Sequence, residues 1–417
     1  MVGLWRPWAV PGVLLVAVEA LLPAVAADAI AGSGPPANTW LPRLAGTAIK
    51  GETLTLDAGG WGGEHLIFSY EWQRCDPQGS NCAAIRGAGT VTRLRSDEYT
   101  LGQADVGQRV RVLVTATNLA GTRSAASPAT AVVADTGFAS GSVEQYGVFS
   151  PALDRAQEVL VYLPPGYSRR RRYPVLYLLH GYPGDPSSLV AGVPAGAAED
   201  ALLARHAMRP LILVMPSGKP DPPADTAWVD GVGSASGWET FVARDVVHWT
   251  DSCFRTDPRG SARGIAGLSD GGYGALNIAL HHPGEFHLVE SWSGYTQADN
   301  TLVNVYGDDP ARLSYNNPAL YLNAAAVALK RAGVFFWLYI GNLDSGLPEN
   351  QRFAAALTVA HVANRFTVFE GSHLPSFYRA HLSLALQLAS SRLTRTPATQ
   401  TRTSRPLPGS CRPTATR

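Results

Sequence analysis

Residues 263–284 read RGIAGLSDGGYGALNIALHHPG and hold Ser269 among five closely spaced glycines. An apolar run precedes the serine, and a helix-like run follows it. Glycine lowers helix stability relative to alanine, so a helix that opens with Gly271, Gly272 and Gly274 must need them for another reason. The pattern Gly-x-Ser-x-Gly between a strand and a helix predicts a sharp turn that presents Ser269 at the tip of a sheet.

The segment from residue 142 to residue 393 alternates continuous apolar runs with amphipathic helical stretches. Runs of this kind, separated by helices, are typical of a mostly parallel sheet that is covered on both faces. We therefore predict an α/β domain over residues 142–393. The runs lie at residues 159–163, 175–180, 211–215, 264–267, 288–293, 334–340 and 366–369.

Residues 40–135 have a different pattern, with little helical signal. Apolar and polar residues alternate in 53–56 and 109–116, three aromatics share one face of 68–72, and glycine-rich turns separate these stretches. Several short alternating strands over about a hundred residues predict an all-β, immunoglobulin-like sandwich. The segment resembles immunoglobulin-like modules of exported bacterial surface proteins. This resemblance implies either a spacer or a contact with polysaccharide or cell wall.

The two ends of the chain look like processing and tail segments. Residues 1–27 have one early positive charge, a short apolar run and small residues at 24–26, a pattern typical of a secretory signal peptide. The alternative is an uncleaved membrane anchor, but Pro11 and Glu19 interrupt the run. Residues 394–417 are rich in Ser, Thr, Pro and Arg and are predicted to be a disordered tail. The chain is therefore expected to be secreted or exposed at the cell surface.

Charge and cysteine content limit the classes of partner. The 417 residues are 46% hydrophobic with a net charge of +1, so no overall field favours nucleic acid as a partner. Export permits disulfides, and Cys75 and Cys82 in the turn-rich CDPQGSNC are predicted to form one. Cys253 and Cys411 form a second candidate pair that the sequence leaves open.

A serine becomes nucleophilic only when a base takes its proton and an acid orients that base. In chains with this turn the order is Ser, then Asp or Glu, then His. His373 follows the last apolar run and precedes the last helical stretch, which makes it the predicted base. Asp344 follows the run 334–340 and is the predicted acid. Glu349, in the same loop, is the alternative.

An ester-cleaving site also needs N–H groups that stabilise the oxyanion of the tetrahedral intermediate. The backbone N–H of Asp270 and the N–H of Tyr182, in the loop after the run 175–180, are the candidates. His180 is expected to be a structural part of that loop. The Asp270 carboxylate would oppose anionic substrates and destabilise the oxyanion if it faced inward. No metal or organic cofactor is expected.

The ordered motifs together resemble the esterase D-like branch of α/β-hydrolases, which includes S-formylglutathione hydrolases, feruloyl esterases and mycolyltransferases. The resemblance covers residues 159–386 and implies a Ser269–His373–Asp344 triad that transfers acyl groups through an acyl-serine. The chain departs from the family where HLPSFY replaces a common His-Asp-Trp pattern and where Asp270 replaces a common methionine. The matching stretches are YPVLYLLHGYPG (173–184), PLILVMPSG (210–218), WETFVARDV (238–246), residues 263–286 and NNP (316–318).

The resemblance implies a secreted serine esterase that acts on a small-molecule or cell-envelope ester. One alternative is an acyltransferase that moves the acyl group to a sugar or lipid hydroxyl. Another is a non-catalytic surface binding protein in which the N-terminal β region carries the function.

Overall fold

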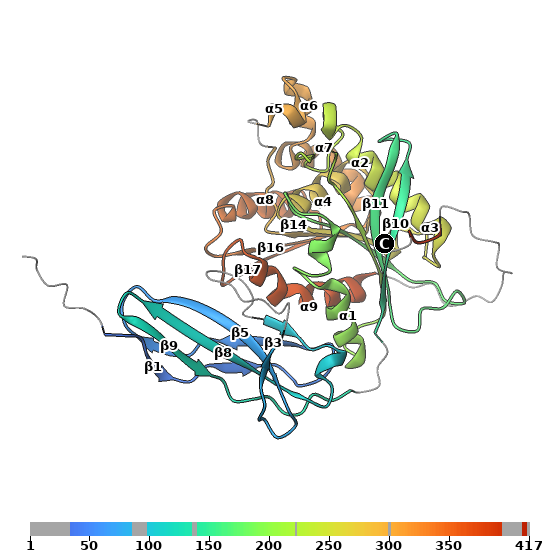
Figure 1. The fold of residues 1–417 in the computed structure, drawn as a ribbon. Coiled ribbons are helices and arrows are strands. Elements are labelled where there is room, and N and C mark those ends of the chain that lie inside the picture. The colour runs from blue at the N-terminus through green and yellow to red at the C-terminus, as the bar shows by residue number, and fades with distance from the viewer. Residues whose placement is uncertain are drawn as a thin grey trace, which may run out of the picture.

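The computed structural model describes residues 34–85, 98–135, 140–221, 223–298, 302–393 and 411–414 (Figure 1). The expected signal peptide, residues 1–27, lies outside this part of the chain. A mainly β N-terminal region packs beside a larger α/β region in Figure 1. Within the described ranges, no helix has the length and apolar character needed to cross a membrane.

The α/β region is built on an eight-stranded sheet in the order β10-β11-β13-β12-β14-β15-β16-β17. Strand β11 pairs antiparallel with β10 and with β13, and every other pair is parallel. All seven predicted apolar runs are strands. The strands are β10 (Ser142–Ser150), β11 (Arg155–Leu163), β12 (Val175–Leu179), β13 (Ile212–Pro216), β14 (Arg263–Leu268), β15 (Leu288–Trp292), β16 (Phe335–Gly341) and β17 (Asn364–Phe369).

Strand β10 has no counterpart among the predicted runs. It lies at the sheet edge, and its residues alternate between exposed and buried, so it lacks the continuous apolar run of a strand buried on both faces.

Helices cover both faces of this sheet, as the alternation of strands and helices predicts. Helices α1 and α9 pack on one face with Leu176 and Leu178 of β12, whereas α4, α7 and α8 pack on the other with Val175 and Tyr177. The helices are α1 (Ala195–Ala204), α2 (Trp238–Thr240), α3 (Val247–Cys253), α4 (Asp270–His281), α5 (Val303–Tyr306), α6 (Pro310–Tyr315), α7 (Pro318–Ala332), α8 (Leu347–Val359) and α9 (Pro375–Arg392). Short 3-10 turns are η1 (Gln103–Asp105), η2 (Pro186–Leu189), η3 (Gly233–Ala235) and η5 (Gly260–Ala262), and η4 (Phe241–Val246) is π-helical.

The N-terminal region contains small antiparallel sheets around a core centred on the fully buried Trp72. One sheet has the order β6-β5-β8-β9, another β2-β3-β7, and a third pairs β1 with β4. The immunoglobulin-like assignment of residues 40–135 stays a prediction. The strands are β1 (Ala37–Trp40), β2 (Arg43–Ala45), β3 (Thr53–Asp57), β4 (Gly60–Gly62), β5 (Ile67–Cys75), β6 (Ala83–Ala84), β7 (Glu98–Thr100), β8 (Arg109–Asn118) and β9 (Gly121–Ala126).

Two ion pairs join the β region to the helices that cover one face of the large sheet. Glu98 of β7 lies 2.6 Å from Arg379 of α9, and Glu52 lies 3.4 Å from Arg205, just after α1. Arg379 also donates to the carbonyl oxygen of Gly192. The β region is therefore docked on α1 and α9, as Figure 1 shows. Its role as a spacer or as a contact with polysaccharide or cell wall stays a prediction.

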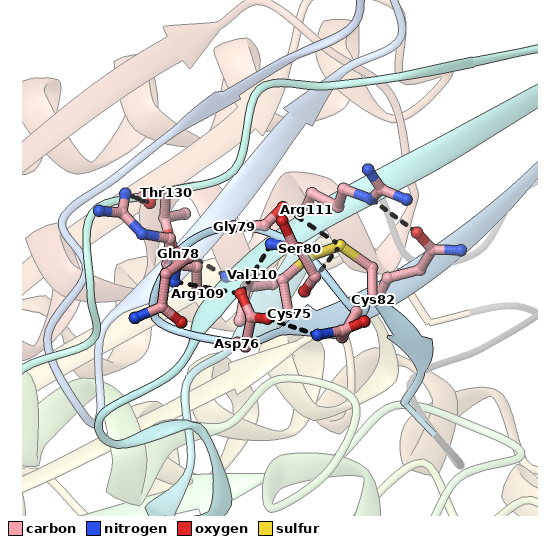
Figure 2. Close-up of a disulfide and its surroundings, with 12 residues drawn as sticks. Cys75, Asp76, Gln78, Gly79, Ser80, Cys82, Arg109, Val110, Arg111 and Thr130 are labelled. Carbon is pink, nitrogen blue, oxygen red and sulfur yellow. Dashed lines mark hydrogen bonds between the residues drawn. A yellow bond between two sulfur atoms is a disulfide. The ribbon is translucent and has the colours of Figure 1, made fainter.

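The predicted Cys75–Cys82 disulfide is present and closes a tight loop between β5 and β6 (Figure 2). Inside the loop the Asp76 carboxylate accepts hydrogen bonds from the backbone N–H groups of Gln78 and Ser80. The bridge therefore staples one loop rather than joining two sheets.

The second bridge joins Cys253, at the end of α3, to Cys411. Beyond it, the backbone N–H of Thr414 donates to the carbonyl oxygen of Gln145 on β10. The expectation of disorder throughout residues 394–417 is therefore wrong for residues 411–414. The disulfide and the hydrogen bonds to an edge strand hold this segment against the folded region.

Removing the Cys253–Cys411 bridge in a Cys253→Ser/Cys411→Ser double variant should destabilise the protein. The bridge closes a loop of 158 residues, so its loss should cost about 2 to 5 kcal/mol and lower Tm by roughly 4 to 10 °C. Differential scanning calorimetry measures this change. A Cys75→Ser/Cys82→Ser variant, whose loop spans seven residues, is the matched control and should lose less. Equal losses in the two variants would contradict the loop-length argument.

Candidate active site

Ser269 lies in the tight turn that the glycine pattern predicts. Its backbone has φ 55° and ψ −120°, a conformation that residues other than glycine rarely adopt. A side chain at Gly267 would place its Cβ 2.2 Å from the carbonyl oxygen of Gly271. A Cβ at Gly271 would lie 2.2 Å from the carbonyl oxygen of Leu179. Strand and helix thus approach too closely for side chains, which explains why the sequence has glycine at these positions.

The structure brings His373 and Asp344 together with Ser269. His373 Nε2 lies 2.8 Å from Ser269 Oγ, and His373 Nδ1 lies 2.7 Å from Asp344 Oδ2. The three residues come from the loops that follow β14, β16 and β17. The Asp344 side chain is only 6% exposed, whereas His373 is 44% exposed and remains open to solvent.

These contacts determine how the imidazole must be protonated to act as a base. A carboxylate can only accept, so Nδ1 carries the hydrogen and donates it to Asp344. Nε2 is then free to accept the hydroxyl hydrogen of Ser269. The arrangement can remove a proton from the serine and stabilise the imidazolium that results.

Glu349, the alternative acid, has a different partner. Its Oε1 accepts a hydrogen bond from the backbone N–H of Thr296 at 2.9 Å. The loops that carry Asp344 and His373 are in close contact at Gly341 and Gly371. A Cβ on Gly341 would lie only 2.3 Å from the carbonyl oxygen of Gly371. This close approach brings Asp344, rather than Glu349, to the imidazole.

The expected oxyanion donors lie beside the serine. Asp270 is the first residue of α4, so its N–H has no acceptor within the helix and points out of the helix N-terminus. A Cβ at Gly181 would lie 3.1 Å from the Ser269 Cβ, which places the loop of Tyr182 directly against the nucleophile turn. The assignment of the Asp270 and Tyr182 N–H groups as oxyanion donors stays a prediction.

His180 holds the Tyr182 loop in place. Its Nδ1 donates to the carbonyl oxygen of Gly181 at 3.0 Å, and its Nε2 accepts from the N–H of Gly218 at 2.9 Å. Burial lowers the pKa of His180 to about 4, so the ring is neutral at physiological pH. The expected structural role of His180 agrees with these contacts.

A pocket opens next to the turn, between the Tyr182 loop and the loop that follows β13. Asp270 lines it and is 7% exposed, and the Tyr295 hydroxyl donates to its Oδ1 at 2.6 Å. Burial, followed by the nearby Asp225 charge, raises the pKa of Asp270 to about 8. At neutral pH this side chain is largely uncharged and does not present the full negative charge that an ionised carboxylate would place beside the oxyanion.

Sequence reasoning missed Asp225 and Tyr295, the two partners of Asp270. Asp225 lies in a proline-rich stretch, PDPPAD, and Tyr295 follows β15, and neither position carries a motif that would single it out. In the described ranges, no three His, Cys, Asp or Glu side chains gather in a way that could hold a metal ion.

The raised pKa of Asp270 makes a prediction about stability. This pKa exceeds the value of about 4 for an Asp in the unfolded chain. The contribution of Asp270 to the free energy of unfolding is therefore fully present below pH ~4 and is lost as the pH rises through about 8. Asp270→Asn cannot ionise, so its Tm relative to the wild type should rise between pH 5 and pH 9. Thermal unfolding at both pH values measures this difference. An unchanged difference would show that Asp270 ionises normally.

Comparison with known proteins places this geometry in a family. A family model described as "Putative esterase" matches residues 150–387, more than half of the chain. Esterase Rv1288 of Mycobacterium tuberculosis is 34% identical over 188 residues, covering 38% of this chain and 38% of that protein. An endo-1,4-beta-xylanase/feruloyl esterase of Xylanibacter ruminicola is 30% identical over 207 residues, covering 46% of this chain and 27% of that protein. The matches thus span well under two thirds of the length of these relatives.

Solved structures agree on the fold. A ferulic acid esterase superposes with a TM-score of 0.54 at 24% identity, covering 60% of this chain and 98% of that one. An S-formylglutathione hydrolase from Agrobacterium tumefaciens gives a TM-score of 0.51 at 18% identity, covering 61% and 96%. These likenesses identify the α/β region as an α/β-hydrolase fold.

Proposed function

Because the chain belongs to the family described as "Putative esterase", we propose that it hydrolyses carboxylic esters through an acyl-serine on Ser269. The observation that carries the proposal is the continuous hydrogen-bonded path from Ser269 through His373 to Asp344, with distances of 2.8 and 2.7 Å. In this proposal residues 142–393 form the catalytic domain, and residues 40–135 form an accessory domain.

The reaction follows from the positions of the groups. His373 Nε2 takes the hydroxyl proton as Ser269 Oγ attacks the ester carbonyl, and Asp344 stabilises the imidazolium. The N–H groups of Asp270 and Tyr182 donate to the oxyanion, and the positive end of α4 favours the same charge. His373 then gives its proton to the leaving alcohol, and the acyl group stays on Ser269. A water activated by His373 releases the acid and restores the serine.

Transfer to an alcohol is the second candidate, since it differs only in what attacks the acyl-serine. His373 is 44% exposed, so a hydroxyl acceptor as well as water can approach it. A partial relative supports this reading: diacylglycerol acyltransferase/mycolyltransferase Ag85A of Mycobacterium leprae is 37% identical over 65 residues, covering 16% of this chain and 19% of that protein.

The two disulfides support a location outside the reducing cytoplasm, either secreted or at the cell surface. A small-molecule or cell-envelope ester is the substrate that suits such a location. Three exposed apolar side chains lie in the loops that carry the site, and they provide a surface for apolar parts of the substrate: Tyr182, Leu343 and Leu374.

Ser269→Ala should abolish ester hydrolysis. Loss of the nucleophile in comparable triads lowers kcat by about 10⁴- to 10⁶-fold, and labelling by a fluorophosphonate should disappear with it. Hydrolysis of p-nitrophenyl esters from acetate to palmitate, with and without glycerol as an acceptor, measures activity, chain-length preference and transfer together. A wild-type protein that neither turns over any of these esters nor takes the label would contradict the proposed function. The binding-protein alternative would then stand first.

Asp344→Asn should reduce kcat by about 10⁴-fold, because the amide can donate to Nδ1 and favour the wrong imidazole tautomer. Glu349→Gln, in the first turn of α8 just after the Asp344 loop, is the matched control and should have a far smaller effect, since an amide oxygen can still accept from Thr296. Steady-state kinetics on p-nitrophenyl acetate compares the two variants. A larger loss in Glu349→Gln would reassign the acid.

A further inference from the structure

The pocket beside the Ser269 turn is lined by polar side chains that take no part in the proposed hydrolysis, among them Asp225 and Asp270. Its lining comes from the Tyr182 loop, from the loop between β13 and η3, and from Asp270 at the start of α4. The second of these loops is held in place, because Thr226 Oγ1 donates to the carbonyl oxygen of Gly218 at 3.0 Å. The pocket is thus a formed cavity that reaches Asp270, the residue directly after Ser269.

The two carboxyl oxygens of Asp270 have different environments. Oδ1 accepts from the Tyr295 hydroxyl, whose ring stacks on Tyr273 with centroids 4.3 Å apart. Oδ2 has no hydrogen-bond partner among the described residues, although Asp270 is 93% buried, as its 7% exposure gives. Oδ2 is not among the fully buried side-chain atoms that lack a hydrogen-bond partner. It therefore keeps some solvent exposure and is accessible from the pocket that Asp270 lines.

The position of the proton on Asp270 follows from these contacts. Burial and the Asp225 charge raise the Asp270 pKa to about 8, so the acid is protonated at neutral pH. Since Oδ1 already accepts a hydrogen bond, the proton resides on Oδ2. The pocket therefore contains a hydrogen-bond donor, the Oδ2–H group, with no acceptor supplied by the described part of the chain.

Asp225 supplies the complementary acceptor. Its Oδ1 accepts from the N–H of Ala227 at 2.8 Å. Burial raises the pKa of Asp225, and the backbone N–H groups of Ala227 and Thr226 oppose this shift, and in either protonation state the side chain offers an oxygen that can accept a hydrogen bond. Asp225 also lines the pocket. A donor on Asp270 and an acceptor on Asp225 match the two hydrogen-bonding functions of one hydroxyl group.

We propose that this pocket is a subsite for a neutral, hydroxyl-bearing part of the ester substrate, which accepts a hydrogen bond from Asp270 and donates one to Asp225. The inference rests on the proposed esterase function and specifies its substrate class. Lys219 and Asp225, which both line the pocket, contribute opposite charges, and the protonated Asp270 contributes none, so the pocket favours neither an anionic nor a cationic group over a neutral one.

Two pairs of substrates test the proposal, since the pocket can receive either side of the ester. The acyl side is compared with p-nitrophenyl glycolate against p-nitrophenyl acetate, and the alcohol side with glucose 6-acetate against hexyl acetate. In the wild type, at least one hydroxylated member should be preferred in kcat/KM. Asp270→Leu should lower that preference by about 3- to 10-fold, the effect of losing one neutral hydrogen bond.

Asp270→Asn is the conservative control, because its amide can donate from the Oδ2 position and accept from Tyr295 at Oδ1. It should keep the preference at pH 7. The wild-type preference should fall between pH 7 and pH 9 as Asp270 loses its proton, whereas the Asn preference should not. The other titratable groups facing the pocket or Asp270 are His180, Tyr182, Lys219, Asp225, Tyr273 and Tyr295.

The measured quantity is the ratio of kcat/KM for the hydroxylated ester to kcat/KM for its partner without the hydroxyl. A substitution that slows both esters equally leaves this ratio unchanged, so a general loss of activity does not mimic the expected result. Equal ratios in the wild type, Asp270→Asn and Asp270→Leu for both pairs would overturn the subsite. If no ester is hydrolysed, the proposed function fails separately. Calorimetric titration with glucose then decides the subsite: weaker binding to Asp270→Leu than to the wild type supports it, and equal or absent binding overturns it.

Discussion

The close approach of strand β14 and helix α4 is the constraint on which the site depends. A Cβ at Gly267 of β14 would lie 2.2 Å from the carbonyl oxygen of Gly271 in α4, and a Cβ at Gly271 would lie 2.2 Å from the carbonyl oxygen of Leu179 at the end of β12, so only glycine permits this packing. The approach forces the chain to reverse within one residue, which gives Ser269 its backbone of φ 55° and ψ −120°. The cost of this strain and of the helix glycines is offset by packing, since α4 is buried along almost its whole length. The hydroxyl is thereby presented at the end of the sheet, beside the N-terminus of a helix.

The remaining groups reach this point because the carboxyl ends of parallel strands meet at one edge of the sheet. The loops after β14, β16 and β17 carry Ser269, Asp344 and His373, which are far apart in sequence but hydrogen-bonded in the structure. The contact between Gly341 and Gly371 draws two of these loops together. Helix α9, which begins directly after this loop, also receives the docked β region through Arg379. Helix α9 therefore contacts the β region and also adjoins the loop that carries His373.

Burial determines the charge around Ser269. Asp270 would be unfavourable beside an oxyanion if it were ionised, but its burial beneath Tyr295 raises its pKa to about 8 and keeps it protonated at neutral pH. The far end of α4 is held by a second polar cluster, in which His281 and His282 contact the buried Glu239 at 2.8 and 2.9 Å. Helix α4 is thus anchored by polar groups at both ends. The carboxylate of Glu239 is stabilised by hydrogen bonds with the ring nitrogens of His281 and His282. Asp270, by contrast, is mostly protonated at neutral pH and carries little charge.

The seven apolar runs of the large sheet, the turn at Ser269 and the order of serine, acid and base could be predicted from the sequence, because each depends on local periodicity or on a short motif. The docking of the β region, the Cys253–Cys411 bridge with its ordered segment 411–414, and the edge strand β10 could not, since they depend on contacts between distant segments. The sequence alone left Asp344 and Glu349 as alternatives, and only tertiary contacts show which one faces His373. The same holds for Asp270: its position beside the serine is determined by the sequence, but its protonation and its free oxygen depend on burial and on Tyr295 and Asp225, which only the folded chain brings near it.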